Sequence, residues 1–107
     1  MNKDHEDLMQ AEKDYQEACQ KLDQCILGLI ESEKNYRERK LEAKKQYLPQ
    51  LLNKKITATL YKELIDTDSD RLKIEYKTAE EIKQLARNSV SMSESKLNTL
   101  KILIKLK

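Results

Sequence analysis

Apolar and small residues recur every seven positions along the first half of the chain. Two such rows, one starting at Leu8 and the other at Ala11, fall on the same side of a helix. Because large side chains alternate with small ones, a partner helix can approach closely along this side. The pattern predicts a helix over about residues 5–47. The first row holds Leu8, Tyr15, Leu22, Leu29, Tyr36 and Ala43, and the second holds Ala11, Ala18, Cys25 and Ser32.

A proline closes this pattern. Pro49 disfavours helical geometry at the residue before it and removes a backbone donor, so the first helix is expected to end or kink there. Thr57 can then cap a short helix over about residues 57–66, on which Leu64 and Ile65 share an apolar face. The sequence therefore predicts a short third helix at the corner of the fold.

The segment "DTDSD" at 66–70 is expected to stop the short helix. Thr67 and Asp70 have the spacing of a capping box, which predicts a last helix over about residues 68–105. This helix carries an apolar stripe of helical period. The stripe consists of Leu72, Tyr76, Ala79, Ile82, Ala86, Val90, Ser93, Leu97, Leu100 and Ile104.

The two stripes favour an antiparallel arrangement of the long helices. Folding them together pairs Tyr36 with Tyr76 and lays the N-terminal region, where residues 1–23 carry seven acids and three bases, beside a basic C-terminal region. We therefore expect an all-α fold and a single domain of residues 1–107, a long coiled-coil-like two-helix hairpin with the short helix at its corner. The same register places Leu29 near Ile82 and pairs Leu22 with Val90, Tyr15 with Leu97 and Leu8 with Ile104.

Composition and motifs argue against catalysis and against a resident cofactor or metal. The chain has one Gly, one Pro and 37% charged residues, which is typical of long helices. Asp66 opens a D-x-D-x-D run like that of a calcium loop, but Arg71 and Lys77 stand where such a loop needs Gly and Glu. The single histidine and two cysteines lack metal-ligand spacing, and no nucleophile motif is present. We expect a non-enzymatic protein.

The N-terminus has no apolar core of a signal peptide, and no apolar run is long enough to span a bilayer. These features predict a soluble protein of the cytoplasm with no membrane partner.

Side chains outside the main seam point to partner binding. Several large apolar residues would stay exposed in a two-helix hairpin, and exposed apolar rows usually contact another molecule. They are Ile26, Leu27, Ile30, Ile74, Leu85, Ile102 and Leu103. The candidate contact residues are Tyr61, Leu64 and Ile65 at the corner and the basic set Arg37, Arg39, Lys40, Lys44 and Lys45. The partner could be another protein, nucleic acid gripped through phosphates, or a second copy in a homo-oligomeric spacer.

Three segments carry a family resemblance: "YQEACQKLDQCILGLIESEKNYRERKLEA", then "ATLYKELI", then "RLKIEYKTAEEIKQLAR". Their order resembles that in short, uncharacterised phage and prophage proteins of Gram-positive bacteria, and the resemblance covers nearly the whole chain. Such proteins look like early-region products that lie among recombination and replication functions or act against host defence. The resemblance implies a host or phage protein as partner, in the bacterial cytoplasm, and an inhibitor of a defence or nucleic-acid-processing machine as the possible role.

Overall fold

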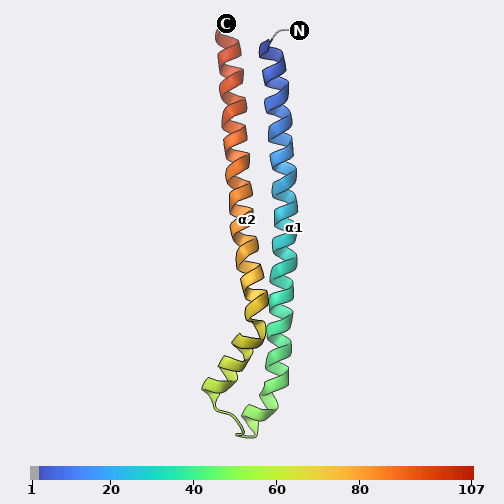
Figure 1. The fold of residues 1–107 in the computed structure, drawn as a ribbon, viewed down its shortest axis with the longest axis vertical. Helices are drawn as coiled ribbons and strands as arrows, with labels where there is room; N and C mark the ends of the chain where they lie inside the picture. Colours follow the sequence, from blue (N-terminus) through green and yellow to red (C-terminus); the bar gives the residue numbers. More distant parts are fainter. Residues whose placement is uncertain (1–2) are drawn as a thin grey trace. The chain divides into compact units, whose positions relative to one another are not determined.

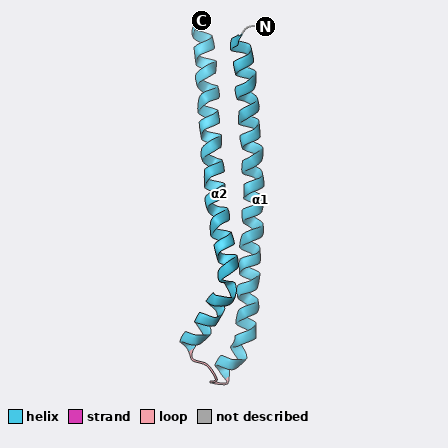
Figure 2. Cartoon of the chain, viewed as in Figure 1, coloured by secondary structure: helices cyan, strands magenta, loops and turns pink. Residues whose placement is uncertain are grey.

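In the computed structural model, which describes residues 3–107, the chain forms two α-helices, α1 (Lys3–Leu52) and α2 (Ala58–Leu106) (Figure 1). No strand occurs in this range (Figure 2). The contacts group into two compact units. The terminal unit comprises residues 3–27 and 81–107, and the turn unit comprises residues 28–80. In each unit a segment of α1 packs against an antiparallel segment of α2, which confirms the all-α helical hairpin; the single domain stays a prediction.

The heptad rows form the seam between the helices. Small residues dominate the buried positions, with Ala11, Ala86 and Leu97 in the terminal unit and Ala43 and Ile65 in the turn unit. Small side chains let two helices approach closely, but they bury little apolar surface. The core of each unit is therefore thin.

Two contacts show the predicted register, one in each unit. In the turn unit the rings of Tyr36 and Tyr76 stack with centroids 5.9 Å apart and an interplanar angle of 28°. In the terminal unit the Lys107 ammonium donates to the Asp4 carboxylate at 2.8 Å. The expected pairing of Tyr36 with Tyr76 is confirmed, and the acidic and basic ends of the chain meet as their charges predict.

Pro49 does not end α1; of the two expected outcomes, an end or a kink at this residue, the end is not observed. It lies in the last turn, where its missing N–H costs one hydrogen bond and the helix continues to Leu52. The closing carbonyls are satisfied by the next amides: Lys55 N–H donates to the Gln50 carbonyl at 2.9 Å and Lys54 N–H to that of Leu51 at 3.1 Å. With Lys54 at φ 57°, this is a Schellman motif that has lysine at the position usually held by glycine.

Thr57 caps α2 as predicted, since its hydroxyl accepts from Leu60 N–H at 3.1 Å. The separate short helix over 57–66 is not observed, and no new helix starts near residue 68, because α2 runs without interruption through "DTDSD". The physical reason is burial: Ser69 is only 2% exposed, and its hydroxyl donates to the Ile65 carbonyl at 2.7 Å within the helix. Such a bond tends to bend a helix, and α2 bends within the turn unit (Figure 1).

One seam position of α2 differs from the apolar stripe. Ile82 is 48% exposed, and the neighbouring Lys83 is half-buried in its place. The heptad repeat explains this difference, because the seam position seven residues after Tyr76 and seven before Val90 is residue 83, and Leu97 follows in the same series. A lysine fits at this position because it can bury its aliphatic stem while its ammonium stays in water. The expectation that Ile82 lies in the seam was therefore wrong.

The apolar residues expected outside the seam are exposed, with one exception. Ile26 is half-buried. The exposed ones are Leu27, Ile30, Ile74, Leu85, Ile102 and Leu103.

Candidate interaction surfaces

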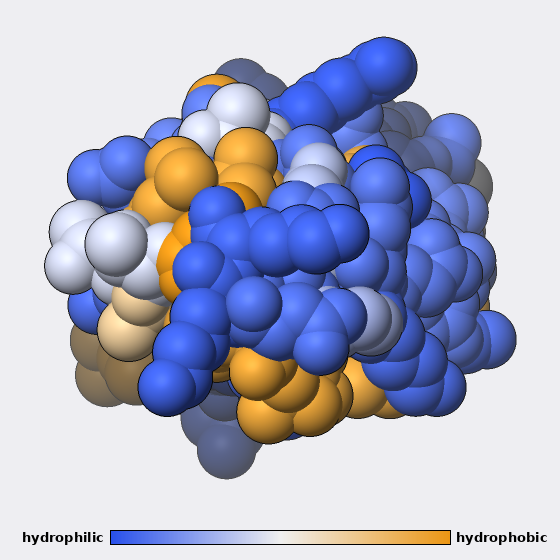
Figure 3. All heavy atoms as spheres, turned by 90° about the horizontal axis from the view of Figure 1, so that it is seen from below, coloured by the Kyte–Doolittle hydropathy of each residue, from blue (hydrophilic) through white to orange (hydrophobic). Residues whose placement is uncertain are grey.

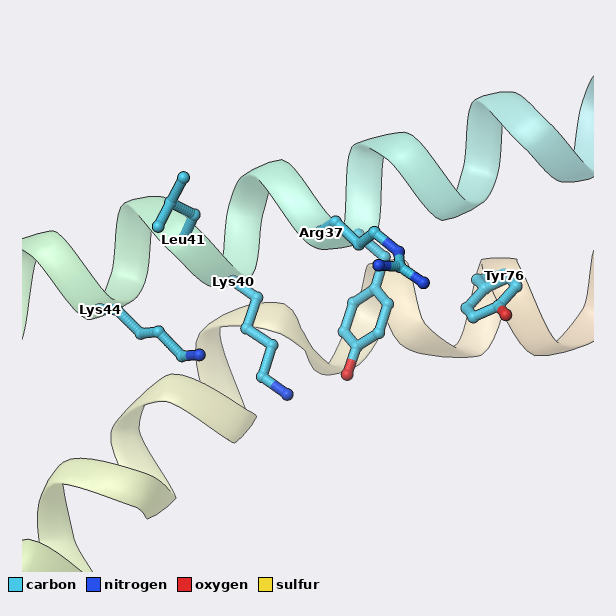
Figure 4. A pocket seen from close by; sticks show the side chains of 6 residues that line it. Arg37, Lys40, Leu41, Lys44 and Tyr76 are labelled. Carbon is cyan, nitrogen blue, oxygen red and sulfur yellow. The ribbon is translucent and has the colours of Figure 1, made fainter.

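Three of the five predicted basic residues gather on one flank of the turn unit. Arg37, Lys40 and Lys44 lie along α1 and line an open groove of about 440 Å³ together with Tyr36 and Tyr76. Figure 4 shows the side chains of Lys40 and Lys44 reaching toward α2, whereas Leu41 points away from them. The spacing of three, four and seven residues places these cations on one helix face.

A second hollow of about 360 Å³ adjoins the first, because Lys40 and Lys44 line both. Its other wall belongs to α2, from which Tyr61 and Lys62 contribute together with Ile65 and Asp66. We call the two hollows together the basic groove. It extends the predicted basic cluster with Lys62, which the sequence did not single out because it is far from the other cations along the chain.

The tyrosine rings in the groove are covered by cations. The Lys40 ammonium lies 5.8 Å from the centroid of the Tyr36 ring, and the Lys77 ammonium lies 5.2 Å from that of Tyr76. Hydrogen bonding to Glu80, with smaller effects of desolvation and of the Glu33 charge, raises the pKa of Tyr76 above its ordinary value. Each ring therefore offers its face to a lysine ammonium, and in the groove Tyr36 does so for Lys40.

Acidic partners neutralise only part of this positive charge. Glu33 accepts from Arg37 at 2.6 Å, and Glu80 pairs with Lys77 at 3.5 Å. Within residues 3–107, no carboxylate forms an ion pair with Lys40, Lys44 or Lys62. Three ammonium groups are thus available to an anion from outside.

Arg39 lies on the opposite flank of the turn unit. Its guanidinium is 3.4 Å from Glu42 and 3.7 Å from Asp68, so its charge is balanced within the unit. Hydrogen bonding to the same Asp68 carboxylate raises the pKa of Tyr47, helped by desolvation and opposed by the Arg39 charge. This polar cluster links α1 to α2 and is a structural feature rather than an open binding site.

Lys45, the last of the predicted basic set, is exposed but lines neither hollow. It projects from α1 about 100° away from Lys44.

The predicted corner residues are only partly accessible. Tyr61 and Leu64 are half-buried, whereas Ile65 is 4% exposed and packs inside the turn unit. Ile65 lines the second hollow but offers little exposed surface there, and its role as a contact residue stays a prediction.

An apolar row runs along the outer face of α1 in the turn unit. Its members are exposed, and their spacing keeps them within about 40° of one another around the helix, roughly opposite Ala43 of the seam. We call this the outer row: Ile30, Leu41, Leu48 and Leu52. Seen from the end that carries the turn, apolar side chains reach the surface between charged ones (Figure 3).

The terminal unit has no cluster of unpaired charges comparable to the basic groove among its described residues. Hydrogen bonding to Cys19 raises the pKa of Tyr15, and the Glu94 charge acts in the same direction. Cys19 and Cys25 are half-buried free thiols. A shallow hollow on this unit is lined by one acidic and one basic side chain, Asp14 and Lys96.

In the described range, no three His, Cys, Asp or Glu side chains meet in a way that could hold a metal ion. Over residues 3–107, neither helix contains an apolar stretch long enough to cross a lipid bilayer. No protein-family model, curated protein or solved structure matches the chain. The resemblance to phage and prophage proteins thus stays a prediction.

Proposed function

We propose that this chain is a non-enzymatic interaction protein that binds and modulates a larger protein of a bacterial host or of a phage in the bacterial cytoplasm. The observation that carries the proposal is the outer row, which exposes four large apolar side chains along one face of α1. The seam already uses the other face of this helix, so nothing within the turn unit covers the row. Exposed apolar rows of this kind mark surfaces that bind other proteins.

The binding mode that fits this surface is a helix laid into an apolar groove of the partner. Ile30 and Leu41 lie eleven residues apart, and Leu48 follows after seven, so successive anchors stay on one face over about 27 Å of helix. Lys34 and Glu38, whose ammonium and carboxylate lie 4.0 Å apart beside the row, would form its polar rim. Charged rims of this kind mainly raise the rate of encounter and favour the correct partner.

The family resemblance supports a phage or prophage origin and, with it, inhibition of a host defence or nucleic-acid-processing machine. A binder without its own active site can inhibit such a machine by covering a surface that the machine needs. This role rests on the resemblance, whereas partner binding rests on the outer row.

Affinity capture from bacterial lysate, followed by mass spectrometry, tests the proposal. The wild-type chain should recover one protein at stoichiometric yield. The double variant I30E/L48E should recover at least tenfold less, because two charges would enter the apolar contact. A matched double variant, N35E/Q46E, adds the same charge at exposed positions of the same helix segment and should recover the wild-type amount.

Two outcomes would contradict the proposal. One is equal capture by I30E/L48E and N35E/Q46E, which would separate binding from the outer row. The other is a wild-type chain that captures only itself and sediments as a stable oligomer, which would make the chain a homo-oligomeric spacer.

A further inference from the structure

We propose that the basic groove of the turn unit binds single-stranded nucleic acid. This activity differs from the protein contact proposed for the outer row, because the two surfaces lie side by side on α1 and share only Leu41, at their border. The juxtaposition that carries it is the convergence of Lys40 and Lys44 from α1 with Lys62 and Tyr61 from α2 on the second hollow.

The charge distribution across the turn unit points to an anionic ligand. On the groove side, Lys40, Lys44 and Lys62 form no ion pair within residues 3–107. Elsewhere in the turn unit two cations are matched, since Arg39 meets Asp68 at 3.7 Å and Arg71 meets Glu75 at 3.5 Å. Unmatched lysines facing one hollow create a local positive potential that attracts phosphates.

The shape and lining of the groove favour a single strand. Tyr61 lies half-buried among the lysines, and an aromatic ring beside a positively charged groove is the combination on which unpaired bases stack. A duplex would keep its bases stacked out of reach of this ring. An acidic peptide fits less well, because extended peptides gain affinity from a sheet edge, and residues 3–107 form no strand.

One carboxylate in the groove should repel the phosphates of the bound strand. Asp66 lies on the α2 wall beside Lys62. Its removal should therefore strengthen binding.

Fluorescence anisotropy with a labelled oligothymidylate of 20 nucleotides tests the proposal. Three unmatched lysines predict a slope of about −2 for log K against log salt, so binding should weaken about 20-fold between 50 and 200 mM NaCl. The variant K40Q/K44Q should bind at least tenfold more weakly at 50 mM and show a flatter slope. D66N should bind about twofold more tightly.

The matched control is K34Q/K45Q, which removes the same charge from the same helix segment outside the groove and should bind within twofold of wild type. Tyr61 has its own control: Y61L should lose at least fivefold with an unchanged salt slope, whereas Y61F should keep the affinity. Circular dichroism establishes that each variant is folded.

Three results would overturn the assignment. They are no binding at 100 µM protein and 50 mM NaCl, equal losses in K40Q/K44Q and K34Q/K45Q, and equal affinity for a 20-base-pair duplex. A poly-glutamate peptide that competes as well as the oligonucleotide would also overturn it, in favour of an acidic protein surface.

Discussion

Lys54 adopts a backbone conformation that lysine rarely takes. Its φ of 57° lies in the left-handed region, where the Cβ atom of an L-residue crowds the following carbonyl oxygen. The conformation persists because it completes the Schellman motif that ends α1, in which the amides of Lys54 and Lys55 reach back to the last turn. The strained conformation of this one residue thus allows the carbonyl groups at the end of α1 to be hydrogen-bonded.

We expect K54G to stabilise the protein by about 0.5–1 kcal/mol, since glycine adopts this conformation without a Cβ penalty, although its flexible unfolded chain offsets part of the gain. Urea unfolding followed by circular dichroism measures the change. K55G is the control, because Lys55 is not among the residues with positive φ, and it should stabilise nothing. Equal effects of the two variants would show that φ at residue 54 is not strained.

Lys83 is a second residue whose side-chain chemistry does not match its position in the fold. It occupies a seam position with a charged side chain, whereas the isoleucine before it faces water. The ammonium must stay hydrated, so only the methylene stem contributes to packing.

Replacing Lys83 with leucine should raise the free energy of unfolding by about 1 kcal/mol, because a half-buried position then gains apolar surface without a charge to hydrate. The matched substitution I82L should change it by less than about 0.5 kcal/mol, since that side chain is exposed. Thermal and urea unfolding report both values. A destabilised K83L would mean that the lysine has a role beyond filling the seam.

At the scale of the helices, small side chains in the seam determine how closely α1 and α2 approach each other. Ala43 is fully buried at 0% exposure, and the register places it level with Ser69, which is 2% exposed. Both side chains are small and buried, so the helices can approach closely here, and a larger side chain would have to displace its neighbours.

The variant A43L should therefore lose about 1–3 kcal/mol of stability through overpacking of the turn unit. K45L places the same side chain on the exposed face of the same helix and should cost less than about 0.5 kcal/mol. Chemical unfolding distinguishes them, and a neutral A43L would show that the helices are less closely packed at this point.

Helix periodicity predicted the seam of α1 and the stacking of Tyr36 on Tyr76, because heptads encode a helix face directly. It failed at "DTDSD", since Asp, Ser and Thr favour caps only when packing does not hold them in a helix, and Ser69 is held by burial. The left-handed cap at Lys54 could not be predicted from the sequence, because the residue in such a cap is usually glycine.

The candidate groove was predictable only in part. Arg37, Lys40 and Lys44 belong to a visible basic cluster, but their separation from Arg39 and Lys45 depends on which face meets α2. Lys62 and Tyr61 join them only through the tertiary register, which no local pattern encodes.

At the scale of the whole chain, the two compact units share both helices. Neither α1 nor α2 is interrupted where one unit ends and the other begins, at residues 27–28 and 80–81. Because breaking a helix in its middle leaves new unsatisfied ends, loss of one unit should destabilise the helix turns that enter the other. We therefore expect the units to unfold in a single cooperative transition.

Two core truncations test this expectation, I65A in the turn unit and L97A in the terminal unit, both at buried positions. Each should lower the free energy of unfolding by about 2–4 kcal/mol, with one transition and an unchanged dependence on urea. Native-state hydrogen exchange supplies the decisive measurement, because I65A should accelerate the slowest amides of the terminal unit as much as those of the turn unit. If I65A accelerates exchange in the turn unit alone, the continuous helices do not couple the units, and each folds on the strength of its own thin seam.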